Sequence, residues 1–107
     1  MKVLKILIID DDSMDHFLYE RWLRGHDLTF VTSKRNASRY LRHEWDLVIC
    51  DYRIPDVMDN ELLYLLEMSC KVPWFGVSTQ IYGAKYDDLV EKKEKPILAK
   101  IDELGLL

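Results

Sequence analysis

The 107-residue sequence has few cysteines, no long apolar run and no excess of positive charge. Cys50 and Cys70 are the only two cysteines, too few for a disulfide framework or a cysteine-based metal site. No apolar stretch approaches the roughly 20 residues that a membrane span requires. The apolar run at 3–9 is also too short for the core of a signal peptide. We therefore expect a cytoplasmic protein that makes no membrane contact.

The charge balance and composition narrow the class of protein further. A net charge of −4 argues against a protein held mainly by nucleic-acid phosphates. The chain is 49% hydrophobic and 32% charged, which is typical of a globular domain rather than a disordered one. No internal repeat, low-complexity tract or linker interrupts it. We expect a single domain over 1–107, with no output domain attached.

Apolar segments alternate with segments of helical spacing along the chain. Strands are predicted at 3–9, 28–32, 46–50 and 74–77, with a short, highly charged fifth strand within 89–95. Helices are predicted after Ser13, at 36–43, at 61–68 and at 97–104. This alternation predicts an α/β fold with a doubly wound, parallel, five-stranded sheet and helices on both faces.

The first predicted helix has a definite start, stop and apolar face. Ser13 is a candidate N-cap and Gly25 a candidate stop. Apolar residues recur at helical spacing between them, and we expect them to form the buried face: Met14, Phe17, Leu18 and Trp22.

Polar residues follow three of the predicted strands. Asp10, Asp11 and Asp12 follow the first, Asp51 the third, and Ser78 the fourth. The carboxyl ends of parallel strands share one edge of the sheet, where ligands of open α/β sheets bind. Clustered carboxylates repel one another unless a cation neutralises them, and oxygen-only ligands suit Mg²⁺. A triplet of aspartates before a helix would by itself be explained as a helix start, but three strand ends and a Lys-Pro pair together favour a site.

Five segments resemble the CheY-like response-regulator receiver family. Leu-Ile-Ile-Asp-Asp-Asp-Ser at 7–13 resembles its first strand and acidic pair, and Trp-Asp-Leu-Val-Ile-Cys-Asp-Tyr-Arg-Ile-Pro at 45–55 its phosphoacceptor strand and loop. The segments at 59–63, 73–78 and 94–97 are similar to a helix start, a strand with its switch hydroxyl, and a lysine loop. The resemblance covers nearly the whole chain.

The resemblance implies a role for each matching residue. Asp51 would be the phosphoacceptor, and it would hold Mg²⁺ together with Asp10, Asp11 and the backbone carbonyl of Arg53. Ser78 would hydrogen-bond the phosphoryl group, and Lys95 would pair with one of its oxygens.

Three further positions have lesser roles. Arg53 and Gln80 occupy positions that often tune dephosphorylation in this family. Asp12 is more typical of a helix start than of a metal ligand.

The sequence departs from the family after Ser78. The stretch up to Lys95 is short and contains Gly83, so we expect the family's fourth helix to be reduced to a loop. The usual aromatic switch residue is absent, and Tyr82 or Tyr86 is a candidate substitute. A second register would make Lys92, at the end of 87–92, the active-site lysine; we prefer Lys95 because Pro96 follows it.

The expected function is signalling rather than enzymatic. The resemblance implies a phosphoprotein of a two-component system or phosphorelay, with a histidine kinase or phosphotransfer protein as donor and another protein as target. The alternative is a pseudo-receiver adaptor that binds its partner without phosphorylation. A hydrolase with an aspartyl intermediate is disfavoured because Arg53 stands where a general acid is usual. The poorly patterned 79–93 region is a candidate surface for a homodimer.

Overall fold

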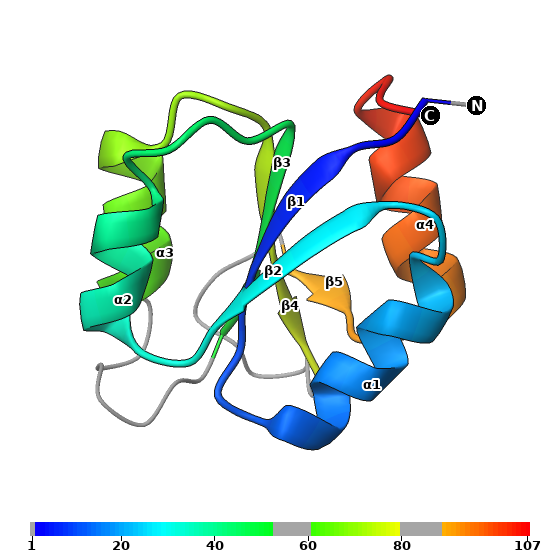
Figure 1. Ribbon diagram of the computed structural model, residues 1–107, viewed down its shortest axis with the longest axis horizontal. Coiled ribbons are helices and arrows are strands. Elements are labelled where there is room, and N and C mark those ends of the chain that lie inside the picture. Colours follow the sequence, from blue (N-terminus) through cyan, green and yellow to red (C-terminus); the bar gives the residue numbers. More distant parts are fainter. Residues whose placement is uncertain (1, 53–60, 80–88) are drawn as a thin grey trace.

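A computed structural model of the chain describes residues 2–52, 61–79 and 89–107 (Figure 1). The elements in chain order are β1 Lys5–Ile9, α1 Ser13–Trp22, β2 Asp27–Val31, α2 Lys34–Tyr40, β3 Leu47–Asp51, α3 Glu61–Ser69, β4 Trp74–Ser78, β5 Val90–Glu91 and α4 Glu94–Glu103. No helix of the described ranges is long and apolar enough to cross a membrane.

The five strands form one parallel sheet in the order β2-β1-β3-β4-β5. Helices α2 and α3 cover one face, and α1 and α4 cover the other (Figure 1). The predicted doubly wound α/β fold is therefore confirmed. All strands run in the same direction, so their carboxyl ends lie along one edge of the sheet.

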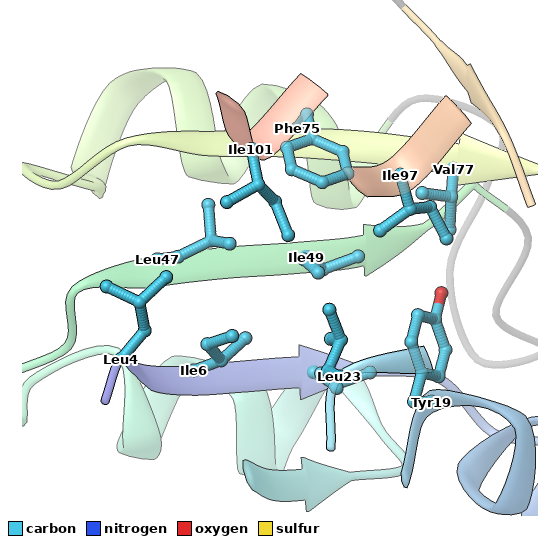
Figure 2. Close-up of a cluster of buried hydrophobic side chains, with 11 residues drawn as sticks. Leu4, Ile6, Tyr19, Leu23, Leu47, Ile49, Phe75, Val77, Ile97 and Ile101 are labelled. Carbon is cyan, nitrogen blue, oxygen red and sulfur yellow. The ribbon is translucent and has the colours of Figure 1, made fainter. Parts of the chain in front are cut away.

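The apolar strand runs supply both layers of the core because successive side chains point to opposite faces. Leu7 and Ile9 of β1 belong to the cluster under α2 and α3. Ile6 and Ile8 pack in the other cluster, with residues of α1 and α4 (Figure 2). Both faces of the sheet are covered, which explains why the central strands read as continuous apolar runs.

Gly76 of β4 lies against the side chains of Leu63 and Leu89. A Cβ at this position would stand 2.8 Å from Leu63 Cδ2 and 2.8 Å from Leu89 Cδ2. Both neighbours are methyl groups at the ends of leucine side chains, so a side chain at position 76 would require these leucines to shift. The glycine therefore allows Leu63 and Leu89 to pack directly against the backbone of β4.

Helix α1 buries a different face from the predicted one. Met14 and Phe17 are 68% and 66% exposed, and Leu18 is 36% exposed, whereas Tyr19 is fully buried. Of the predicted residues, Trp22 packs partly buried against the core, but the prediction was wrong for the other three, because apolar spacing alone does not fix the rotation of a short helix. The cap also differs by one residue: Asp12 is the N-cap, and its carboxylate accepts a hydrogen bond from the Met14 amide at 2.9 Å. The prediction of Asp12 as a helix-start residue is thus confirmed.

The region after Ser78 is only partly described. The predicted loop in place of a fourth helix, with Gln80, Tyr82 and Tyr86, lies almost entirely outside the described residues. The described part begins again at Leu89, and β5 is only two residues long, a short strand within the predicted 89–95. Helix α4 begins at Glu94, three residues earlier than predicted.

Candidate functional site: an acidic pocket around Lys92

The register of the sheet brings the polar strand ends together. Ile9 of β1 pairs with Cys50 of β3, so Asp10 and Asp51 are neighbours at the ends of adjacent strands. On the next strand Ser78 pairs with Glu91 of β5, and the Lys92 amide donates to the Ser78 carbonyl at 3.0 Å. A cavity of about 500 Å³ opens at this edge. Its lining is Asp11, Asp12, Ser13, Asp15, Asp51, Ser78, Thr79 and Lys92.

Asp10 lies at the base of the cluster and has no exposed surface. Its Oδ1 accepts from the Asp12 amide at 3.0 Å, and its backbone carbonyl accepts from His16 Nε2 at 2.8 Å. The His16 ring stacks on Phe30, with 4.3 Å between ring centroids. These contacts fix Asp10 by its carboxylate and by its backbone.

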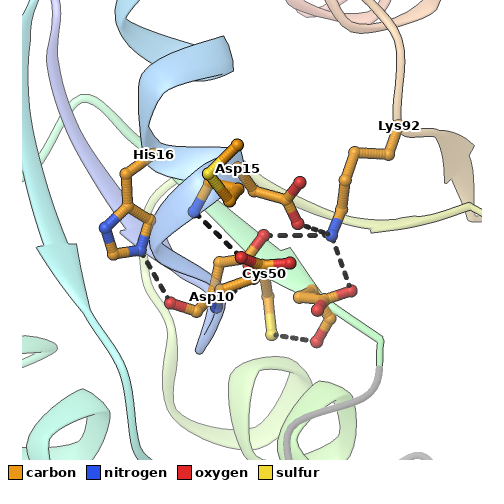
Figure 3. A network of polar contacts seen from close by, with 8 residues as sticks. Asp10, Asp15, His16, Cys50 and Lys92 are labelled. Atoms are coloured by element: carbon orange, nitrogen blue, oxygen red, sulfur yellow. Dashed lines mark hydrogen bonds and ion pairs between the residues drawn. The ribbon is translucent and has the colours of Figure 1, made fainter.

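Lys92 is the cation of this site. Its Nζ lies 3.0 Å from Asp10 Oδ2, 2.9 Å from Asp15 Oδ2 and 3.3 Å from Asp51 Oδ1, and its side chain is 5% exposed. Figure 3 shows the ammonium facing Asp10 and Asp15. The ammonium donates hydrogen bonds to Asp10 and Asp15, and Asp51 is its ion-pair partner.

The structure places Lys92, and not the preferred Lys95, in the acidic pocket. Lys95 is exposed in the first turn of α4, while Lys92 follows β5 and is buried among the carboxylates. The proline that suggested a lysine-proline loop has another explanation. Pro96 also lies in the first turn of α4, where no intrahelical partner is needed for its missing N–H. The alternative register, with Lys92, is the one that the structure has.

Asp15 was not predicted as a site residue. It lies in the first turn of α1, and its contact with Lys92 joins α1 to the end of β5. The signal was present in the sequence: Asp15 precedes Tyr19 by four residues, and i and i+4 share one face of a helix. An acid on the buried face of a helix requires a cation nearby. The predicted apolar face did not include Tyr19, so this relation was not recognised.

Burial and charge act in opposite directions on the ionisable groups. Burial raises the pKa of Asp10 above its ordinary value, although the Asp12 amide and Lys92 both lower it. Burial lowers the pKa of Lys92, but the hydrogen bond to Asp15 and the charges of Asp51 and Asp10 outweigh it, so this pKa lies above its ordinary value. One ammonium thus remains charged while sharing several carboxylates.

The cluster has the donor set of a hard-cation site. Oxygens of Asp10, Asp11 and Asp51 all lie within 4.8 Å of one another, and Asp11 is exposed. Carboxylates this close are costly to keep ionised together, which a divalent cation would relieve. Carboxylate oxygens with open access to water fit Mg²⁺, since Mg²⁺ usually retains several waters. The predicted fourth ligand, the carbonyl of Arg53, lies outside the described residues.

Ser78 lies where the prediction required, at the end of β4 and lining the pocket. Neither cysteine is among the residues that line this pocket. Cys50 is fully buried in the core under α2 and α3, and burial together with nearby Asp51 and Asp10 raises the pKa of its thiol. Cys70 packs against the same cluster. Both are free thiols with structural surroundings.

Comparisons with known proteins identify the fold but not a family by sequence. No family model matches the chain, and no curated protein matches it. Solved receiver domains match over almost the whole chain. The Francisella response regulator 1452 receiver domain is 19% identical with a TM-score of 0.74, covering 94% of this chain and 95% of that one.

Two further structures agree. The CheY-like receiver domain from Methylobacillus flagellatus is 20% identical with a TM-score of 0.73, over 94% of this chain and 99% of that one. The N-terminal domain of a response regulator/sensory box/GGDEF protein from Carboxydothermus hydrogenoformans is 18% identical with a TM-score of 0.76, over 95% and 93%. The chain therefore has the fold of a CheY-like response-regulator receiver domain.

Proposed function

We propose that this protein is a phosphorylation-switched receiver that accepts a phosphoryl group on Asp51 and signals through contact with another protein. The observation that carries the proposal is the convergence of Asp10, Asp11 and Asp51 around one edge of the sheet, with Lys92 3.3 Å from Asp51 Oδ1. Asp51 is partly exposed in the pocket, so a phosphodonor has access to it.

The chemistry is the transfer of a phosphoryl group from a donor to the carboxylate of Asp51. A carboxylate oxygen of Asp51 forms a bond to phosphorus, and the bond from phosphorus to the donor's leaving atom breaks; that atom is an imidazole nitrogen in a phosphohistidine and an oxygen in acetyl phosphate. With acetyl phosphate the leaving group is acetate, which departs with the bonding electron pair. Asp10, Asp11 and Asp51 would hold Mg²⁺, which when bound offsets the negative charge on the phosphoryl oxygens. Lys92 and Ser78 would donate hydrogen bonds to those oxygens.

The physiological donor in this proposal is a histidine kinase or a phosphotransfer protein, and the target is another protein. The described surface offers no assignment of either. A homodimer through 79–93 remains a proposal, and most of that region lies outside the described residues.

Intact mass after incubation with acetyl phosphate and Mg²⁺ tests the function. We expect the wild type to gain the mass of one phosphoryl group, and both omission of Mg²⁺ and Asp51→Asn to abolish the gain. Asp46→Asn is the matched control, because Asp46 lies at the opposite edge of the sheet and its oxygen accepts from the Lys5 amide. A wild type that gains no mass and binds no Mg²⁺ would favour the phosphorylation-independent adaptor.

A further inference from the structure

The hydroxyl group of Tyr19 lies buried beside the acidic pocket without a hydrogen-bond partner in the described structure. The whole side chain has no exposed surface. It extends from α1 towards Val77 and Ile97, at the carboxyl ends of the strands (Figure 2). An unpaired buried hydroxyl typically costs about 1–3 kcal/mol relative to a paired one. Its persistence in the core therefore requires an explanation.

The hydroxyl is a hydrogen-bond donor placed next to carboxylates. Burial raises the pKa of Tyr19, and the charges of Asp10, Asp51 and Asp15 raise it further, so the phenol stays protonated. Asp15 is four residues before Tyr19 on α1, and long helical side chains point towards the preceding turn. The Tyr19 ring is therefore directed towards the turn that carries Asp15.

Asp15 is occupied by Lys92, at 2.9 Å from its Oδ2. The ammonium donates hydrogen bonds to Asp10 and Asp15, and Asp51 is its ion-pair partner at 3.3 Å. A phosphoryl group on Asp51 adds acceptor oxygens that attract the ammonium. Asp15 belongs to α1, whereas Asp10 directly follows β1, the strand beside β3, so movement of the ammonium towards a group on Asp51 would lengthen the Asp15 contact.

We propose that Asp15 is a positioning residue with two partners: it holds the Lys92 ammonium while Asp51 is unmodified, and it accepts the Tyr19 hydroxyl once the ammonium has moved to a phosphoryl oxygen. The inference rests on the proposed function of Asp51. It connects α1 directly to the phosphorylation state of Asp51 through Asp15 and Tyr19, which lie on the same face of the helix. The orphan hydroxyl is explained as a donor whose partner becomes available only in the second state.

Tyr19→Phe removes the hydroxyl and preserves the packing. The effect of the hydroxyl can therefore be measured separately in the free protein and in the protein that carries a phosphoryl analogue. We expect the free protein to keep its stability to urea or gain some, because the lost hydroxyl has no partner there. The apparent affinity for beryllofluoride, a tetrahedral analogue of the phosphoryl group, should fall about 10-fold in the presence of Mg²⁺, measured by calorimetry, since hydrogen bonds to charged groups contribute at this level. Tyr64→Phe is the matched control: Tyr64 is 63% exposed on α3, and neither measurement should change.

A second variant connects Tyr19 to Asp15. In an Asp15→Ala background the acceptor is gone, so Tyr19→Phe should cause no further loss of beryllofluoride affinity. An undiminished loss in that background would overturn the assignment of Asp15 as acceptor. Lower stability of the free Tyr19→Phe protein with unchanged affinity would show an ordinary structural hydroxyl and overturn the inference, leaving the proposed function intact. A wild type that binds no beryllofluoride and accepts no phosphoryl group would overturn both.

Discussion

Two cavities lie at opposite edges of the sheet, and the smaller one holds the clustered charges. The cavity at the amino edge has a volume of about 900 Å³, against about 500 Å³ at the carboxyl edge. Its polar groups have local partners: Trp45 Nε1 donates to the Tyr40 carbonyl at 2.7 Å, and Asp46 accepts from the Lys5 amide at 2.8 Å. At the carboxyl edge Asp10, Asp15 and Asp51 share Lys92. The difference between the two cavities teaches that a cluster of carboxylates sharing one cation, rather than a large volume, distinguishes the candidate site.

The largest effect should come from replacing each of the two candidate lysines by alanine in turn. Lys92→Ala should slow phosphorylation of Asp51 by acetyl phosphate about 100-fold, because it removes a cation aimed at the phosphoryl oxygens. Lys95→Ala should leave the rate unchanged, since Lys95 is exposed on α4. The rate of mass gain measures both, and circular dichroism establishes that Lys92→Ala folds with Asp10 left unpaired. A larger effect of Lys95→Ala would restore the register that the structure contradicts.

Mg²⁺ should stabilise the carboxyl edge specifically. A cation that binds only the folded protein adds about 2.7 kcal/mol at a concentration 100 times its Kd. We therefore expect an increase in the melting temperature with Mg²⁺, measured by calorimetry. Asp11→Asn should reduce that increase, because Asp11 contributes to the oxygen cluster. Asp102→Asn, an exposed change on α4, should retain the full increase. An equal response in both variants would place the Mg²⁺ elsewhere.

The smallest effect should come from the amino edge. Trp45→Phe removes the indole N–H that donates to the Tyr40 carbonyl at the end of α2. The free energy of unfolding should fall by about 1 kcal/mol, the usual contribution of one hydrogen bond, as measured with urea. The rate of Asp51 phosphorylation should not change. A parallel loss of phosphorylation would show that the two edges are coupled, and would weaken the distinction between them.

The fold and the carboxylates of the site were predictable from the sequence. Buried parallel strands leave continuous apolar runs, and the polar residues after them mark one edge of the sheet, which placed Asp10, Asp51 and Ser78 correctly. The rotation of α1 was not predictable from apolar spacing. Two faces of α1 fit the helical spacing: the predicted one, with Met14, Phe17 and Leu18, and the one with Tyr19. Only packing against the sheet decides which of them is buried.

Which of the two lysines lies in the pocket was not predictable for a related reason. Lys92 and Lys95 are separated by fewer residues than one helical turn, and the boundary between β5 and α4 decides which of them faces the pocket. That boundary depends on how β5 pairs with β4, a long-range contact with no local sequence signal. Pro96 suits a helix start and a loop equally well, so it could not separate the registers.

The position of Lys92 also has a consequence for folding. It binds Asp10 across 82 positions of sequence, and it follows an edge strand of two residues that pairs with β4 alone. Such a strand can detach by a small local opening, well below the free energy of global unfolding. The lysine would leave the pocket with it while the rest of the sheet stayed intact. Under the proposed function, competence for phosphorylation depends on closure of this last edge, and hydrogen exchange at the Lys92 amide would measure how often the site is complete.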